Sequence, residues 1–128
     1  MGKPVALIRN PLIPTIGETI MSVQERIQKL VNDNKVMLFM KGTPEQPMCG
    51  FSSTVIEILK RLSVEYNSAN VLDDAADSEL RNGIKEFSDW PTIPQLYVNG
   101  EFVGGCDLAI ELYQSGELEK IIVGEDAE

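Results

Sequence analysis

The sequence contains no histidine and only two cysteines, Cys49 and Cys106. Without histidine, the chain cannot by itself form a Ser-His-Asp triad, a Cys-His pair or an HExxH zinc site. Two cysteines are also too few to complete a four-sulfur metal site within one chain. Any metal chemistry therefore needs ligands from a second chain or from a small molecule.

Positive charge and long apolar runs are also scarce. The 128 residues include 11 Lys and Arg against 20 Asp and Glu, which gives a net charge of -9. Such a chain repels phosphate backbones, so we expect no nucleic-acid partner. No stretch reaches the roughly 18–20 apolar residues that span a bilayer, so we expect no membrane partner. Two cysteines do not resemble a secreted disulfide framework, which favours a reducing compartment.

What is present suffices for one folded domain. Hydrophobic residues make up 43% of the sequence, which is enough for an apolar core. Ser22 and Glu25 fit a capping box, which predicts that the folded part starts with a helix there. We expect a flexible N-terminal arm over residues 1–21, one domain over 22–123 and an acidic tail over 124–128. The arm is also compatible with the remainder of an organelle presequence.

Apolar periodicity predicts the order helix, strand, helix, strand, helix, hairpin, helix. The apolar run 36–40 is typical of a buried strand, and Asn99-Gly100 predicts a hairpin. The first two strands should be parallel with a right-handed crossover, and the hairpin adds two antiparallel strands. We therefore expect an α/β fold with a mixed four-stranded sheet and helices on both faces. The expected strands are 36–40, 64–69, 95–98 and 101–103, and the later helices start near 50, at 73 and after 107.

Cys49 lies directly before the helix predicted from Gly50. The first turn of a helix offers free N–H groups and the positive end of a dipole, and both stabilise a thiolate. Lys41 adds a positive charge, so we expect a lowered pKa for Cys49; a buried, inert cysteine is the alternative. Ser52 occupies the second sulfur position of a Cys-x-x-Cys pair, so only a mixed disulfide with an outside thiol or with Cys106 remains.

Two further motifs lie near strands. Pro94 precedes the strand expected from 95, where proline is allowed and where a cis peptide is one possibility. Gly104-Gly105 permits a close backbone approach to a ligand. Asp107 is predicted to cap the last helix, with a ligand role as the alternative. The residues expected to point inward from that helix are Leu108, Ile110, Leu112 and Tyr113.

Four blocks of the sequence occur in one register: Met40-Lys41-Gly42-Thr43-Pro44, Cys49-Gly50-Phe51-Ser52, Trp90-Pro91-Thr92-Ile93-Pro94-Gln95-Leu96-Tyr97-Val98 and Gly104-Gly105-Cys106-Asp107. Together they resemble the CGFS-type monothiol glutaredoxins over residues 22–122. The resemblance implies the thioredoxin fold, with Pro94 as the family's cis-proline facing Cys49, the catalytic residue.

The same resemblance implies a glutathione site. Lys41 and Arg81 would hold the glycine carboxylate, and the backbone of Ile93 would pair with the cysteinyl portion. Cys106 and Asp107 would receive the glutamyl end. Phe51, Thr92 and Pro94 complete the implied cofactor-binding set.

The family's usual role is to hold a [2Fe–2S] cluster between two subunits, with Cys49 and one glutathione thiolate from each subunit as ligands. The resemblance implies a homodimer with cluster and a monomer without it. BolA-like proteins and apo iron–sulfur proteins would be partners. We predict a cluster carrier rather than a turnover enzyme; the alternative is a glutathione-dependent thiol-disulfide oxidoreductase that removes glutathione from proteins. Cys106 is either a structural thiol or a disulfide partner of Cys49. The implied location is the bacterial cytoplasm or the mitochondrial matrix.

Overall fold

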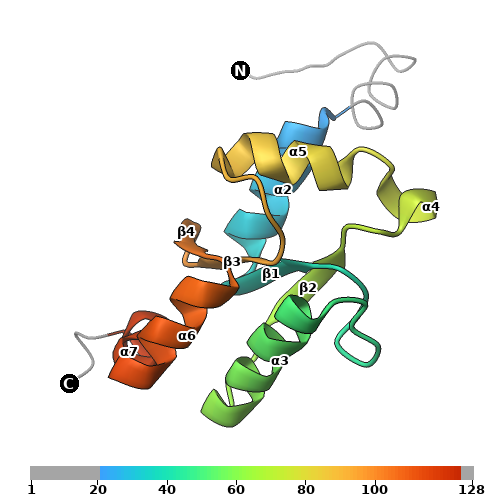
Figure 1. Ribbon diagram of the computed structural model, residues 1–128. Helices are drawn as coiled ribbons and strands as arrows, with labels where there is room; N and C mark the ends of the chain where they lie inside the picture. Colours follow the sequence, from blue (N-terminus) through green and yellow to red (C-terminus); the bar gives the residue numbers. More distant parts are fainter. Residues whose placement is uncertain (1–20, 125–128) are drawn as a thin grey trace, which may run out of the picture.

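The computed structural model describes residues 21–124. The predicted arm and acidic tail lie almost wholly outside these residues. A four-stranded sheet lies between two helical layers (Figure 1), which confirms the predicted α/β fold. Helices α2 (Val23–Asp33) and α5 (Leu80–Ser88) cover one face. Helices α3 (Gly50–Leu62) and α6 (Cys106–Ser115) cover the other, and α7 (Glu117–Val123) packs on α6. Between residues 21 and 124, no helix is long and apolar enough to span a membrane.

The strands follow the order β2-β1-β3-β4 across the sheet. Strand β1 (Val36–Met40) runs parallel to β2 (Asn67–Asn70), as predicted for two strands joined by a helix. Strand β3 (Gln95–Val98) is antiparallel to β1 and forms the predicted hairpin with β4 (Glu101–Gly104). Strand β2 starts later than the predicted 64. The N–H of Val64 still bonds to the carbonyl of Leu59, so the chain is leaving α3 there.

Strand β1 divides the core into two clusters. Leu38 and Met40 face α3 and α6, whereas Met37 and Phe39 face α2 and α5. All five residues of β1 are buried, which explains why the run is apolar without alternation. The strand ends at Met40, so Lys41 and the loop before α3 follow directly after a central strand of the sheet.

The third predicted helix is interrupted. A short helix, α4 (Asp74–Asp77), ends before α5 begins, instead of one continuous helix from Asp73. The carboxylate of Asp77 accepts from the N–H of Glu79 at 3.1 Å and pairs with Arg26 at 2.9 Å. A short acidic side chain that bonds its own backbone competes with helix continuation. Because Arg26 lies on α2, a contact between distant parts of the chain sets this break.

Candidate functional site around Cys49

Cys49 is the N-cap residue of α3 and has extended backbone angles, φ -161 and ψ 137. The preceding loop is closed by a hydrogen bond from the N–H of Met48 to the carbonyl of Lys41 at 2.8 Å. The loop thereby returns the chain to the end of β1 and places the cysteine at the helix N-terminus. Cys49 is a free, half-buried thiol, so it is not the buried, inert cysteine of the alternative interpretation.

The surroundings of the two cysteines shift their pKa values in opposite directions. Partial burial tends to raise the pKa of Cys49, but the N–H groups of Ser52 and Phe51, the Ser52 hydroxyl and the charge of Lys41 together lower it below its ordinary value. Burial raises the pKa of Cys106, and the negative charges of Asp107 and Cys49 raise it further. Cys49 therefore loses its proton at a lower pH than Cys106 does.

Ser52 contributes to the site beyond replacing a second cysteine. Its side chain is fully buried, and its hydroxyl accepts a hydrogen bond from the N–H of Lys41 at 3.1 Å. The hydroxyl also lowers the pKa of Cys49. Ser52 thus connects the end of β1 with the thiol. Sequence reasoning missed this role, although the third residue of a helix is well placed to reach back to the N-cap.

A cavity of about 900 Å³ lies beside the first turn of α3 and brings most of the predicted ligand residues together. The loop between α5 and β3 forms one wall, with a cis peptide bond between Ile93 and Pro94. We call this cavity the groove. The predicted residues that line it are Lys41, Phe51, Thr92, Ile93, Pro94, Cys106 and Asp107.

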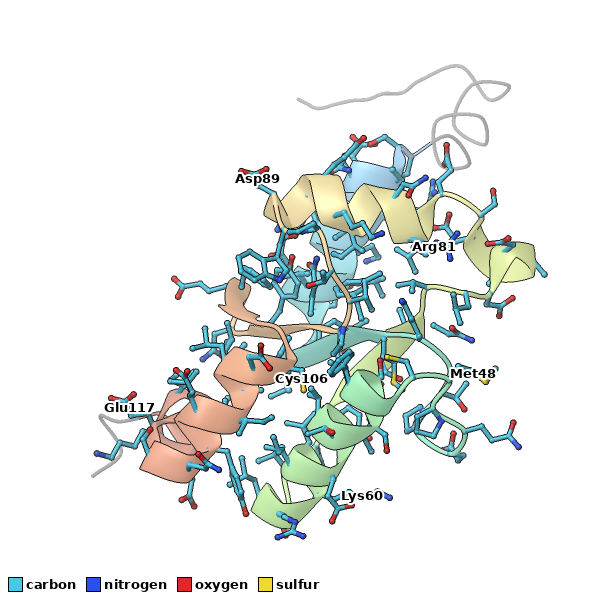
Figure 2. All side chains as sticks on the ribbon, viewed as in Figure 1. Met48, Lys60, Arg81, Asp89, Cys106 and Glu117 are labelled. Atoms are coloured by element: carbon cyan, nitrogen blue, oxygen red, sulfur yellow. The ribbon has the colours of Figure 1, made fainter. Side chains whose placement is uncertain are left out.

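The groove is lined by Lys85 rather than by Arg81. Arg81 is exposed on the first turn of α5, near α4 (Figure 2), and is not among the lining residues. Lys85 lies one helical turn later, is half-buried and lines the groove together with Lys41. Sequence reasoning missed Lys85, although residues four apart share one face of a helix. The two lysines make this side of the groove positive.

The opposite side of the groove is acidic because Asp107 does not cap α6. The helix begins at Cys106, with Gly105 as N-cap and no side-chain capping bond, so the prediction that Asp107 is the cap was wrong. Its carboxylate lines the groove instead, as does Glu111 one turn later. Leu108 is 41% exposed rather than inward, and Ala109 is buried in its place.

Cys106 starts α6 on the side of that helix that faces α3 (Figure 2). The hydroxyl of Thr54 on α3 partly counters the rise in the pKa of Cys106. The groove therefore has cations at one end, carboxylates at the other and the Cys49 thiol beside it. This arrangement complements an elongated ligand with a carboxylate at one end and an ammonium group at the other.

Because the pKa values of Cys49 and Cys106 are shifted in opposite directions, we expect the alkylation rates of the two cysteines to depend differently on pH. The rate with iodoacetamide should rise about tenfold per pH unit until the pKa is passed and then level off. We expect Cys49 to level off at a lower pH than a free cysteine, and Cys106 at a higher pH. Peptide mass spectrometry measures both sites in one sample. In urea the two profiles should converge, and identical profiles in the folded protein would contradict the assignment.

The glutaredoxin family model matches residues 36–103, and the chain belongs to the glutaredoxin family. It is 61% identical over 98 residues to probable monothiol glutaredoxin 2 of Rickettsia prowazekii (strain Madrid E), which covers 77% of this chain and 89% of that protein. It is 55% identical over 96 residues to glutaredoxin-related protein 5, mitochondrial, of Danio rerio, covering 74% of this chain and 60% of that one.

Solved structures agree. The solution structure of reduced poplar apo GrxS14 matches with a TM-score of 0.67 and 44% identity, covering 93% of this chain and all (100%) of that chain. A buckwheat glutaredoxin–glutathione complex matches with a TM-score of 0.70, covering 79% and 87%; at 23% identity it supports the fold alone. With Cys49 at the helix N-terminus and serine at position 52, the chain is a monothiol member of this family.

Proposed function

We propose that this monothiol glutaredoxin carries a [2Fe–2S] cluster, bound at a dimer interface through glutathione, and transfers it to apo-proteins. The observation that carries the proposal is the position of Cys49, a free thiol with a lowered pKa at the N-terminus of α3, beside the groove. Position 52 is a serine, so no second sulfur lies there to resolve a mixed disulfide at Cys49. Such a thiol is suited to remain a ligand. Between residues 21 and 124, no three His, Cys, Asp or Glu residues lie together as a metal site. The sequence holds two cysteines and no histidine, so we propose that the other ligands come from glutathione and a second chain.

Glutathione is the small molecule that fits the groove. Its glycine carboxylate matches the side formed by Lys41 and Lys85, and its glutamyl ammonium matches Asp107. Its thiol would then lie near Cys49. The buckwheat glutaredoxin, which shares the fold, was solved as a glutathione complex, so this fold can hold a ligand of this class. Two chains and two glutathione molecules would supply the four thiolates that a [2Fe–2S] cluster requires.

The surface next to the thiol supports a protein partner. Met48, directly before Cys49, is 67% exposed and points away from the domain (Figure 2), and Phe51 is 63% exposed. Large exposed apolar side chains on either side of one site are typical of a contact surface. We propose that this surface receives the second subunit in the cluster-bound homodimer, and in its place a BolA-like protein or an apo-protein. The chain without cluster would be a monomer, in a bacterial cytoplasm or a mitochondrial matrix.

Anaerobic reconstitution tests the proposal. The purified chain is incubated with iron and sulfide, with and without glutathione, and followed by visible absorbance and size-exclusion chromatography. We expect a coloured dimer with glutathione and a colourless monomer without it. A colourless monomer under both conditions would contradict the carrier function. Rapid turnover of a glutathionylated substrate by that colourless protein would instead support the oxidoreductase alternative.

Lys85 provides a second test of the ligand site. Replacing it by glutamine removes one of the two groove cations, so we expect glutathione to bind about fivefold more weakly, or about 1 kcal/mol. Isothermal titration measures this change. The matched control is Lys60→Gln, since Lys60 lies at the far end of α3 (Figure 2). Arg81→Gln should have a smaller effect than Lys85→Gln; the reverse order would support the assignment of Arg81 made from the sequence.

A further inference from the structure

Gln95 is a buried polar residue that the proposed function does not use. It is the first residue of β3, its side chain is fully buried, and it does not line the groove. Among residues 21–124, Ser52 is the only other polar or charged residue buried to this degree. Burying an amide is costly unless its donors and acceptors are paired, so its hydrogen bonds indicate what it does.

The Gln95 amide holds the wall of the groove from behind. Its nitrogen donates to the carbonyl of Trp90 at 3.2 Å and to the carbonyl of Thr92 at 3.1 Å. Both carbonyls belong to the irregular segment between α5 and β3, where Pro91 and Pro94 have no N–H to offer. Two bonds from one buried side chain therefore fix the path of this segment.

The bond to Thr92 also sets the direction of the next N–H group. The Thr92–Ile93 peptide is trans and planar, so its carbonyl and its N–H point in opposite directions. With the carbonyl directed to the buried Gln95, the N–H of Ile93 is directed away from the core. Ile93 lines the groove, and its N–H makes no hydrogen bond to another backbone group among residues 21–124, so this N–H is free to meet a ligand in the groove.

Tyr97 determines which way the amide is turned. The Tyr97 hydroxyl donates to Oε1 of Gln95 at 3.2 Å, which leaves the amide nitrogen facing the two carbonyls. The Tyr97 ring is itself held edge-on against Phe39, with centroids 5.6 Å apart, and by Phe102 at 5.3 Å. If the amide turned over, its oxygen would face two carbonyl oxygens and both bonds would be lost.

We propose that Gln95 is a positioning residue that aims the N–H of Ile93 into the groove, and that Tyr97 orients the Gln95 amide. The proposal rests on the proposed glutathione site, whose cysteinyl peptide groups are the partners for Ile93. It predicts a specific defect. A disulfide substrate that contains peptide groups needs the Ile93 N–H in the correct direction in order to bind in the groove. A small disulfide without peptide groups does not need this hydrogen bond.

The test compares glutathione disulfide with 2-hydroxyethyl disulfide. In both reactions the Cys49 thiolate attacks one sulfur, the disulfide bond breaks, a mixed disulfide forms at Cys49 and the other half leaves as a thiolate. Rates of mixed-disulfide formation are measured by mass spectrometry for the wild type, Gln95→Met, Tyr97→Phe and the control Gln28→Met. Gln28 is exposed on α2, far from the groove.

We expect Gln95→Met to slow the reaction with glutathione disulfide about tenfold and Tyr97→Phe about threefold, with 2-hydroxyethyl disulfide and Gln28→Met unchanged. Equal slowing with both disulfides, or no slowing with either, would overturn the positioning role. Tyr97→Phe keeps the ring and its packing, so it carries the test if Gln95→Met does not fold. A wild type that shows no preference for glutathione disulfide would overturn the glutathione site, and the positioning role with it.

Discussion

Cys49→Ser is expected to abolish the visible absorbance after anaerobic reconstitution, together with the dimer and all mixed-disulfide formation at position 49. A serine hydroxyl does not ionise near neutral pH, so the features that lower the pKa of Cys49 have no anion to stabilise. The change removes one sulfur atom at the N-cap, where serine is a favoured residue. The free energy of unfolding should therefore stay within about 1 kcal/mol of the wild type.

Cys106→Ser is the matched comparison. It makes the same sulfur-to-oxygen change at the other cysteine, which lines the groove and has a raised pKa. The substitution leaves the backbone at position 106 in place to receive the glutamyl end of glutathione, so most of the absorbance should remain. Equal loss in both variants would show that both sulfurs are ligands and would contradict the proposed ligand set. Mass spectrometry of the oxidised wild type, with oxidised Cys106→Ser as the control, also shows whether Cys49 and Cys106 form a disulfide.

Gly42→Ala is expected to have the largest effect on stability, a loss of about 3 kcal/mol in the free energy of unfolding. Gly42 has a φ of +93, which side chains rarely adopt. An added Cβ would lie 2.5 Å from the carbonyl oxygen of Gln46 and from the backbone nitrogen of Met48. These are backbone atoms that cannot rotate away, so the loop must open and Cys49 must move.

Urea denaturation measures the stability change, and glutathione titration measures the displacement of the site. Gly50→Ala is the control, because a Cβ at Gly50 meets nothing within 4 Å and Gly50 lies in the first turn of α3. Alanine there should leave stability unchanged or raise it by up to about 1 kcal/mol. A similar loss of stability in both variants would mean that the backbone flexibility of glycine, rather than the lack of space for a Cβ at Gly42, determines the stability of the loop.

The local signals of the sequence are enough for most of the fold. The run 36–40 is apolar because both faces of β1 are buried, and Asn99-Gly100 marks the hairpin by its turn chemistry alone. Cys49 could likewise be placed at a helix N-terminus because the helix 50–62 has a strong apolar period. These features depend on residues near each other in the chain.

The sequence predictions were wrong or incomplete where the local structure depends on contacts between residues far apart in the chain. The break before α5 depends on Arg26 pairing with Asp77, a contact across 51 positions that no local pattern encodes. Asp107 has the chemistry of a cap, but α6 starts two residues earlier than predicted, with Gly105 as its N-cap, and the Asp107 carboxylate lines the groove instead. Lys85 enters the groove only because α5 packs beside the loop that precedes β3.

Trp90 is the single tryptophan of the sequence, and it lines the groove with its side chain 45% exposed. Its ring rests on Phe102, with centroids 5.9 Å apart, so it is held in place at the site rather than free in solvent. All indole emission from the protein therefore originates beside the thiol. Ligand entry, thiol ionisation and cluster loading can each be followed as a change in intrinsic fluorescence, with no added label and no background from elsewhere in the chain.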